Sequence, residues 1–217
     1  MKKIFVMFSL FIVLLISACK LDTTVDIYVG DLSDALEDDL QTNGKLFVQM
    51  PSSDECEDKS AKIIEIISKY MNEVKNEGCD SQDMESYLKL SAKFTITAKE
   101  ESDETYNVYV EDADDLGLKV SFKIDSAKFS SLNSEINSEF NQEIELAKST
   151  MKFELNNDLR ETVLLSSIGS LSINNAPHVQ VEEMELKRRD KVEIRFSNIH
   201  SELLEKERIT PLFYLKL

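Results

Sequence analysis

The stretch Leu88–Ala98, LKLSAKFTITA, alternates apolar and polar residues without interruption. In a β-strand, its apolar residues would lie on one face and its lysines, serine and threonines on the other. A strand with one buried face and one face in water is typical of an antiparallel sheet that is covered on one side. This stretch therefore predicts a β-sheet with a polar face.

The same alternation recurs on both sides of this stretch. The acidic residues 111–115 join two of the expected strands and are typical of a hairpin connection, and Asn43-Gly44 predicts a turn. Gly169 lies inside another expected strand, where it predicts a bulge or a break. The further strands are expected at residues 25–29, 46–50, 106–110, 116–124, 151–155, 162–173, 179–186, 192–196 and 212–217.

Two longer segments follow the period of a helix instead. Apolar residues recur at steps of three and four over residues 59–75 and again over 129–147. The sequence therefore predicts an α+β fold, mainly antiparallel sheet with two long helices packed on one face. This folded region would span residues 25–217, and the polar stretch 100–104 is the candidate boundary between two subdomains.

The first residues of the chain, MKKIFVMFSLFIVLLISAC, have the order of a secretory signal. Two lysines precede an apolar run, and small residues precede a cleavage point. The apolar run Ile4–Ile16 is shorter than the roughly 20 residues that a membrane-spanning helix needs. The segment Ile16-Ser17-Ala18-Cys19 resembles the lipobox of bacterial lipoproteins. This resemblance implies that residues 1–18 are a signal peptide and that Cys19 carries lipid such as palmitate.

The lipobox resemblance also implies where the protein is held. Several acyl chains on Cys19 would hold it at a membrane, because a single chain gives only marginal attachment. Residues 19–24 would then be a lipidated anchor and short tether to the cell envelope. In Gram-negative bacteria the residue after the cysteine directs sorting. Lys20 is not the Asp that is linked to inner-membrane retention, so the resemblance favours the outer membrane.

The charge of the chain excludes some partners. The formal net charge is −16, and loss of the two N-terminal lysines with a signal peptide would take it from −16 to −18. A field of this sign repels nucleic acid and anionic membrane surfaces. We therefore expect no nucleic-acid partner, and we expect membrane attachment to come from the lipid on Cys19.

Two cysteines remain, Cys56 and Cys79. An even pair in an exported chain favours a disulfide. A helix over residues 59–75 argues against it, because such a helix would be about 24 Å long and bonded cysteines need Cα atoms within about 7 Å. The bond requires that the helix end early and the chain turn back, so both alternatives stay open at this point. No histidine or third cysteine lies at a spacing that predicts a metal site.

The sequence contains no motif for catalysis. His178 and His200 are its only histidines, no serine lies in a G-x-S-x-G segment, and no H-E-x-x-H segment occurs. The acidic run 111–115 lacks the spacing of a calcium-binding EF-hand loop, so we expect a solvated turn there. The sequence therefore predicts a protein that is not an enzyme and that uses no cofactor or metal.

One basic cluster interrupts the acidic pattern. Lys187, Arg188 and Arg189 lie between two expected strands and should form the tip of a hairpin. Such a tip would contact lipid headgroups or an acidic partner, or it would only discourage pairing at a sheet edge. These three residues are the candidate partner contact.

The layout of the mature chain is similar to that of lipoproteins carried by bacterial phages, plasmids and integrated elements. The similarity rests on TTVDIYVGDL soon after the cysteine, MPSSDECEDKSAKII leading into a helix, and the hairpin VEEMELKRRDKVEIRF. It implies no particular activity. We expect a non-enzymatic envelope lipoprotein that binds another envelope protein, for example a surface or exclusion protein of a mobile element or an assembly factor. The alternative is a lipoprotein that binds a small ligand in an apolar pocket.

Overall fold

The structure is a computed structural model that describes residues 20–82, 85–100 and 104–217. The expected signal peptide and the lipidation site Cys19 lie outside the described residues. Strand makes up 48% and helix 27% of the structure, and the helices are short. The α+β fold with two long helices that the sequence predicted is therefore wrong, because the protein is mostly β.

The strands and helices occur in the following order along the chain. The strands are β1 (Leu21–Tyr28), β2 (Leu40–Met50), β3 (Asn72–Gln82), β4 (Glu85–Thr97), β5 (Tyr106–Asp112), β6 (Leu118–Ile124), β7 (Met151–Asn156), β8 (Val163–Ser167), β9 (Leu171–Ile173), β10 (Ala176–His178), β11 (Glu183–Leu186), β12 (Lys191–Phe196) and β13 (Ile209–Lys216). The helices are α1 (Val29–Asp34), α2 (Ser53–Ile67), α3 (Ser126–Phe140) and α4 (Asn198–Glu207), with 3-10 turns η1 (Asp114–Leu116) and η2 (Leu146–Lys148).

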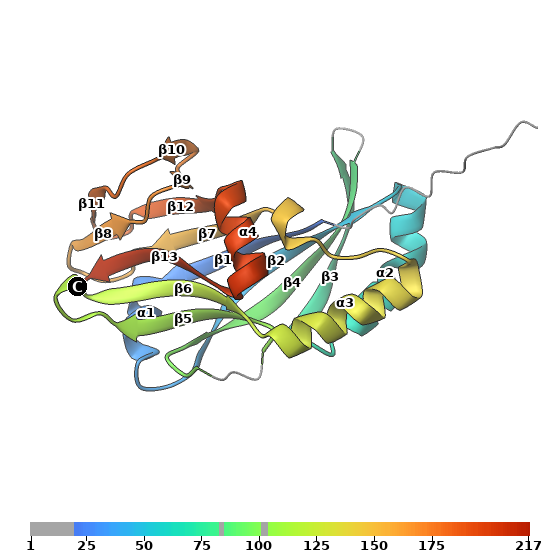
Figure 1. Cartoon of the computed structure of the whole chain (residues 1–217), viewed down its shortest axis with the longest axis horizontal. Coiled ribbons are helices and arrows are strands. Elements are labelled where there is room, and N and C mark those ends of the chain that lie inside the picture. Colours follow the sequence, from blue (N-terminus) through green and yellow to red (C-terminus); the bar gives the residue numbers. More distant parts are fainter. Residues whose placement is uncertain (1–19, 83–84, 101–103) are drawn as a thin grey trace, which may run out of the picture.

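All of these strands belong to one curled sheet. Twelve follow the order β10-β9-β12-β7-β1-β2-β4-β5-β6-β13-β8-β11, and β3 pairs with β4 beside that path. The β1–β7 and β4–β5 pairs are parallel. The sheet curls into a half-barrel, and α3 and α4 cross in front of it in Figure 1. Strands β4 and β5, on either side of the candidate boundary at residues 100–104, are neighbours in this sheet.

The core lies on the inner face of the curled sheet. Strand β4 keeps the alternation of buried and half-buried residues that its sequence predicted. Successive aromatic rings contact one another across the interior, with centroids 5.1 to 6.4 Å apart. These rings belong to Phe94, Tyr106, Phe122, Phe153 and Phe196. Because a fully buried apolar side chain stabilises a fold by roughly 1.5–3 kcal/mol, this row of rings contributes substantially to holding the curled sheet together.

Both long helices end earlier than their sequences predicted. Helix α2 ends at Ile67 rather than at residue 75, and α3 ends at Phe140 rather than at residue 147. After α3, Asn141 adopts a left-handed conformation with φ 54°, a common way to end a helix. The apolar residues beyond each helix end belong to later elements and pack onto the same core. Their helical spacing therefore did not mean that the helix continues through them.

Strands β8 to β11 form one hairpin that is bent in the middle. In its first arm β8 continues into β9 across residues 168–170, and in its second arm β10 continues into β11 across residues 179–182. One half of the hairpin pairs with β13 and the other half with β12, at opposite ends of the strand order. The bent hairpin therefore connects the two ends of the curled sheet. The break that the sequence predicted at Gly169 lies at this bend.

Candidate functional site

The turn between β11 and β12, called the tip below, carries the three cations that the sequence singled out. The hairpin expected here is wrong, because β11 pairs with β8 and β12 pairs with β7 and β9 rather than with each other. Lys187, Arg188 and Arg189 are all exposed, and none forms an ion pair with another residue of the described chain. The N–H of Asp190 donates to the carbonyl of Lys187 at 2.9 Å and closes the turn. The three charges are therefore free to meet a partner.

Asn157 holds this tip in place from the side of the sheet. Its side chain and backbone are 1% exposed, and its backbone exchanges hydrogen bonds with the tip. Its N–H donates to the carbonyl of Asp190 at 3.0 Å, and its carbonyl accepts from the N–H of Arg189 at 2.7 Å. Its side-chain Nδ2 donates to the carbonyl of Leu186 at 2.8 Å. Because unpaired buried polar groups are costly, these bonds fix the position of the tip.

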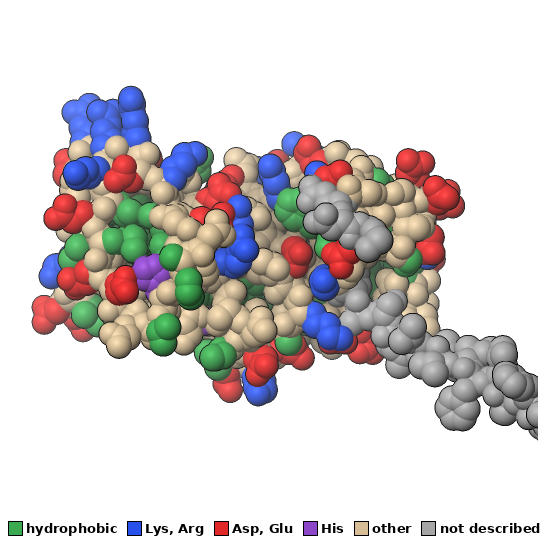
Figure 2. Space-filling model, turned by 90° about the horizontal axis from the view of Figure 1, so that it is seen from above, with side chains coloured by type: hydrophobic (Ala, Val, Ile, Leu, Met, Phe, Trp, Pro, Cys, Tyr) green, Lys and Arg blue, Asp and Glu red, His purple; other side chains and the backbone are tan. Residues whose placement is uncertain are grey.

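The tip lies at the end of the sheet that is far from Lys20. Strand β1 begins at Leu21 and runs parallel to β7, and β7 ends at Asn156, opposite Lys191 just beyond the tip. The eight residues of β1, at 3.3 Å per residue, put roughly 26 Å between its start and the tip. In Figure 2, Lys and Arg side chains gather in a projection at the left end of the molecule, where β11 and β12 lie in Figure 1.

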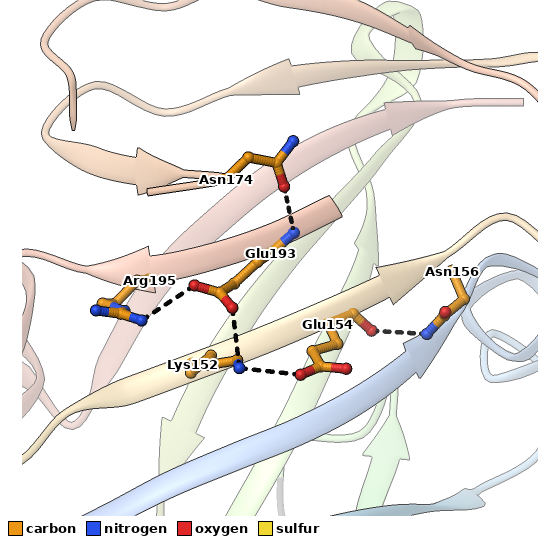
Figure 3. Close-up of polar contacts among 6 residues, drawn as sticks. All are labelled: Lys152, Glu154, Asn156, Asn174, Glu193 and Arg195. Carbon is orange, nitrogen blue, oxygen red and sulfur yellow. Dashed lines mark hydrogen bonds and ion pairs between the residues drawn. The ribbon is translucent and has the colours of Figure 1, made fainter. Parts of the chain in front are cut away.

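A second polar surface is the face of the sheet opposite the core, where charges of both signs alternate. Lys152 Nζ lies 2.9 Å from a carboxylate oxygen of Glu193 and 3.0 Å from one of Glu154. Arg195 Nη2 lies 3.1 Å from the other carboxylate oxygen of Glu193, as Figure 3 shows. The hydrogen bond from Lys152 lowers the pKa of Glu193 and raises the pKa of Lys152. Each of these two shifts favours the charged form of its group, so Lys152 and Glu193 stabilise each other as an ion pair.

Two hollows lie next to each other on this face, over β1. The larger, of about 350 Å³, is lined by residues including Asp22, Phe47, Tyr87 and Lys89. The smaller, of about 240 Å³, is lined by residues including Asp26, Tyr28, Lys45, Glu154 and Lys191. Thr24 lines both hollows. These two adjoining hollows along β1 are together called the groove below.

The floor of this groove carries two half-buried carboxylates. Asp22 accepts the N–H of Thr150 at 2.5 Å, and burial raises the pKa of Asp22. Burial also raises the pKa of Asp26, with a further contribution from the charge of Glu154. The floor therefore offers hydrogen-bond acceptors beside the lysines of the walls.

Cys56 and Cys79, for which the sequence left two alternatives open, are joined in a disulfide with their Cα atoms 6.1 Å apart. The geometric objection assumed a helix over residues 59–75. Because α2 ends at Ile67, the chain turns back and β3 returns toward the start of α2. The bond ties the buried Cys56, in the first turn of α2, to β3.

The remaining candidate residues lie apart from both surfaces. His178 Nδ1 is 2.8 Å from the carboxylate of Glu182 in the bent hairpin. His200 is buried on α4 against the ring of Phe196, with centroids 5.4 Å apart, and burial lowers the pKa of His200. The acidic run 111–115 ends β5 and begins η1. Within the described ranges, no three His, Cys, Asp or Glu side chains are arranged to hold a metal ion.

Among the residues that the structure describes, every helix is too short or too polar to cross a bilayer.

The fold and its two polar surfaces define a protein with one curled β-sheet, a charged outer face and a protruding basic turn. The chain belongs to the family described as a domain of unknown function, DUF7424, whose sequence model matches residues 21–217. This match begins at the first residue of β1. No curated protein and no solved structure matches the chain.

Sequence reasoning found the tip but missed the groove and the role of Asn157. The groove collects side chains from strands that are far apart in the sequence, so no local motif marks it. One signal was present in β1, where polar residues occupy every second position from Asp22 to Asp26. Asn157 gave no signal, because the polar run Asn156-Asn157-Asp158 after a strand is typical of any loop.

Proposed function

We propose that this protein is a lipoprotein of the cell envelope that binds an acidic surface of another envelope protein through Lys187, Arg188 and Arg189. Its role is non-enzymatic, and its anchor is the lipid on Cys19. In a Gram-negative cell, Lys20 favours the outer membrane. The observation that carries this proposal is a fixed cluster of free cations on a chain of net charge −16.

The position of the tip suits a contact with a protein. With Cys19 in the membrane, the start of β1 would be close to the bilayer and the tip roughly 26 Å away along the strand. The tip would then be presented away from the headgroups of the anchoring membrane. A protein partner is therefore favoured over lipid for this surface.

The charge distribution suits an acidic partner. The body of the protein repels acidic surfaces, whereas the tip attracts them locally. Complementary charges mainly set the rate and the specificity of association. We therefore expect a partner with a confined acidic patch that meets the tip without facing the acidic body.

The alternative function, a small ligand in an apolar pocket, gains no support from the groove over β1. Charged and polar side chains line both of its hollows. The aromatic rings of the core instead fill the inner face of the sheet, and Phe94, Phe122 and Phe153 are fully buried.

Crosslinking in intact cells, followed by recovery of the full-length protein from envelope fractions, tests the proposal. Lys187→Glu/Arg188→Glu should reduce recovery of the crosslinked partner at least tenfold, since it reverses two charges at the tip. Lys75→Glu/Lys206→Glu is the matched control, because it makes the same charge change at exposed lysines on β3 and α4. Equal recovery from both variants, or equal loss, would count against the tip as the contact.

The anchor is tested separately. Mass spectrometry of the native protein should show acyl chains on Cys19 at the new amino terminus, and Cys19→Ser should release the protein from membranes. An unmodified cysteine in the membrane fraction would contradict the proposed anchor and leave the contact at the tip to be judged by the crosslinking result.

A further inference from the structure

The two hollows of the groove adjoin at Thr24 and together follow β1. Asp22, Thr24, Asp26 and Tyr28 point into it from alternate positions of the strand. The distance from the first to the last is roughly 20 Å, at 3.3 Å per residue. A ligand that fills the groove is therefore an extended molecule, longer than a single small metabolite.

Its walls carry almost balanced charge. Five cations and four carboxylates line the two hollows: Lys45, Lys89, Lys152, Lys191 and Arg195, with Asp22, Asp26, Asp80 and Glu154. Several of these charges already pair with each other, as Lys89 does with Asp80 and Lys152 with Glu154. A strongly charged ligand of either sign would meet like charges along the whole groove.

The chemistry of these walls instead fits groups that donate and accept hydrogen bonds at once. Lysine and arginine only donate, and carboxylates only accept. A hydroxyl group does both, so it can bridge a cation and a neighbouring carboxylate without bringing charge. A chain of hydroxyl-bearing units matches this alternation over its whole length.

Aromatic side chains add apolar surface to the groove. Phe47 lies between Asp22 and Lys89 in one row across β1, β2 and β4, and Tyr87 lines the same hollow. Tyr28 lies at the far end of the groove and is 38% exposed. Rings of this kind provide an apolar body beside polar groups, which suits the C–H face of a sugar ring.

An extended peptide fits the groove less well. Peptides that add to a sheet use an open strand edge, but β1 lies inside the sheet between β2 and β7. Its backbone groups are already used in both ladders. A peptide would have to rely on side-chain contacts with a polar surface.

We propose that the groove over β1 binds an uncharged oligosaccharide of several rings. This inference goes beyond the proposed protein contact and uses a different surface, in which Asp22, Thr24 and Lys45 hydrogen-bond sugar hydroxyls and Phe47 packs against a ring.

The test uses the full-length protein, purified in a detergent without a sugar headgroup, and saturation-transfer NMR. Maltotriose, N-acetylchitotriose and mannotriose are the probes at millimolar concentration. We expect binding of at least one trisaccharide, with little change when the salt concentration is raised, because the ligand carries no charge.

Two variants locate the binding. Thr24→Tyr fills the point where the hollows meet and should weaken binding at least tenfold, and Lys45→Ala, at an exposed side chain, should weaken it severalfold without affecting the fold. The tip variant Lys187→Glu/Arg188→Glu is the control and should bind like the wild type.

Three results would overturn the inference. The first is no binding of any of the three trisaccharides by the wild type. The second is binding that Thr24→Tyr and Lys45→Ala leave unchanged. The third is binding of a sulfated heparin oligosaccharide, abolished by salt, in place of the neutral probes, which would assign an anionic ligand. None of these results depends on the protein contact at the tip.

Discussion

The carbonyl oxygen of Val179 lies 2.8 Å from the point at which a side chain at position 169 would carry its Cβ atom, and the chain has glycine there. This close approach lets the two arms of the bent hairpin pass each other at the bend. In Gly169→Ala, the added methyl group would clash with the backbone at Val179, which cannot move aside as a flexible side chain could. We expect it to lower the free energy of unfolding by about 1–3 kcal/mol, measured by urea denaturation.

A second glycine provides the control for this variant. The Cβ of an alanine at position 30 would meet the carboxylate of Asp158 at 3.1 Å, and that side chain can move. Gly30→Ala should therefore change the free energy of unfolding by less than about 1 kcal/mol. If both variants were equally stable, the bend would not depend on glycine.

Asn157→Ala should loosen the basic tip. The side chain of Asn157 bonds the carbonyls of Leu186 and Glu161 at 2.8 and 2.9 Å, and alanine would leave both without this partner. We expect a loss of about 2–4 kcal/mol in the free energy of unfolding and faster hydrogen exchange at the amide of Arg189. Asn137→Ala is the control, because that side chain is exposed on α3 and bonds Glu143. Unchanged exchange at Arg189 would show that the tip is held by other contacts.

The disulfide should contribute to stability through the loop that it closes. Cys56 and Cys79 are 23 residues apart, and a loop of this length is worth about 3 kcal/mol in the chain-entropy model. Cys56→Ala/Cys79→Ala should lower the free energy of unfolding by that amount in urea. Adding a reductant should bring the wild type close to the variant and leave the variant unchanged. A variant as stable as the wild type would contradict a disulfide in the native protein.

His200 should make stability depend on pH. Burial lowers the pKa of His200 from its ordinary value of 6.5, so near and below that pH the unfolded chain takes up a proton that the folded chain does not. Its contribution to stability is therefore complete above pH 6.5 and is lost as the pH falls toward the folded pKa. The melting temperature should fall between about pH 7.5 and pH 5.5. His200→Gln should show a smaller fall, and identical slopes for both proteins would exclude His200 as the cause.

The sequence predicted individual strands better than their assembly. The alternation in Leu88–Ala98 corresponds to β4. A turn at Lys187 was expected, but the strands on either side of it pair with other strands and not with each other. The pairing of β1 with β7, in contrast, joins residues such as Thr23 and Met151, and no local pattern specifies which strands become neighbours. The curled sheet therefore could not be derived from strand periods alone.

Two local signals were misleading for a physical reason. Asn43-Gly44 predicted a turn but lies inside β2, because Gly44 lets the ring of Phe94 lie directly against the strand. The helical periods ran past the ends of α2 and α3, because apolar residues of later elements, such as Val74 and Ile144, pack on the same core. In both cases tertiary packing overrode a local preference.

The bent hairpin affects the order in which the newly made chain can fold. The last strand, β13, lies between β6 and β8, so the link from the bent hairpin to β6 exists only when residues 209–216 have arrived. A chain that crosses a membrane with its N-terminus first would have β1 outside long before its partner β7 appears. In such a chain, β1–β2, β2–β4, β3–β4 and β5–β6 can pair early, but the β1–β7 pair and both pairs of β13 would form only after the later strands had crossed. Such distant contacts form slowly and leave strand edges exposed to aggregation. Chaperones that shield emerging strands should matter more for this protein than for one built from local hairpins.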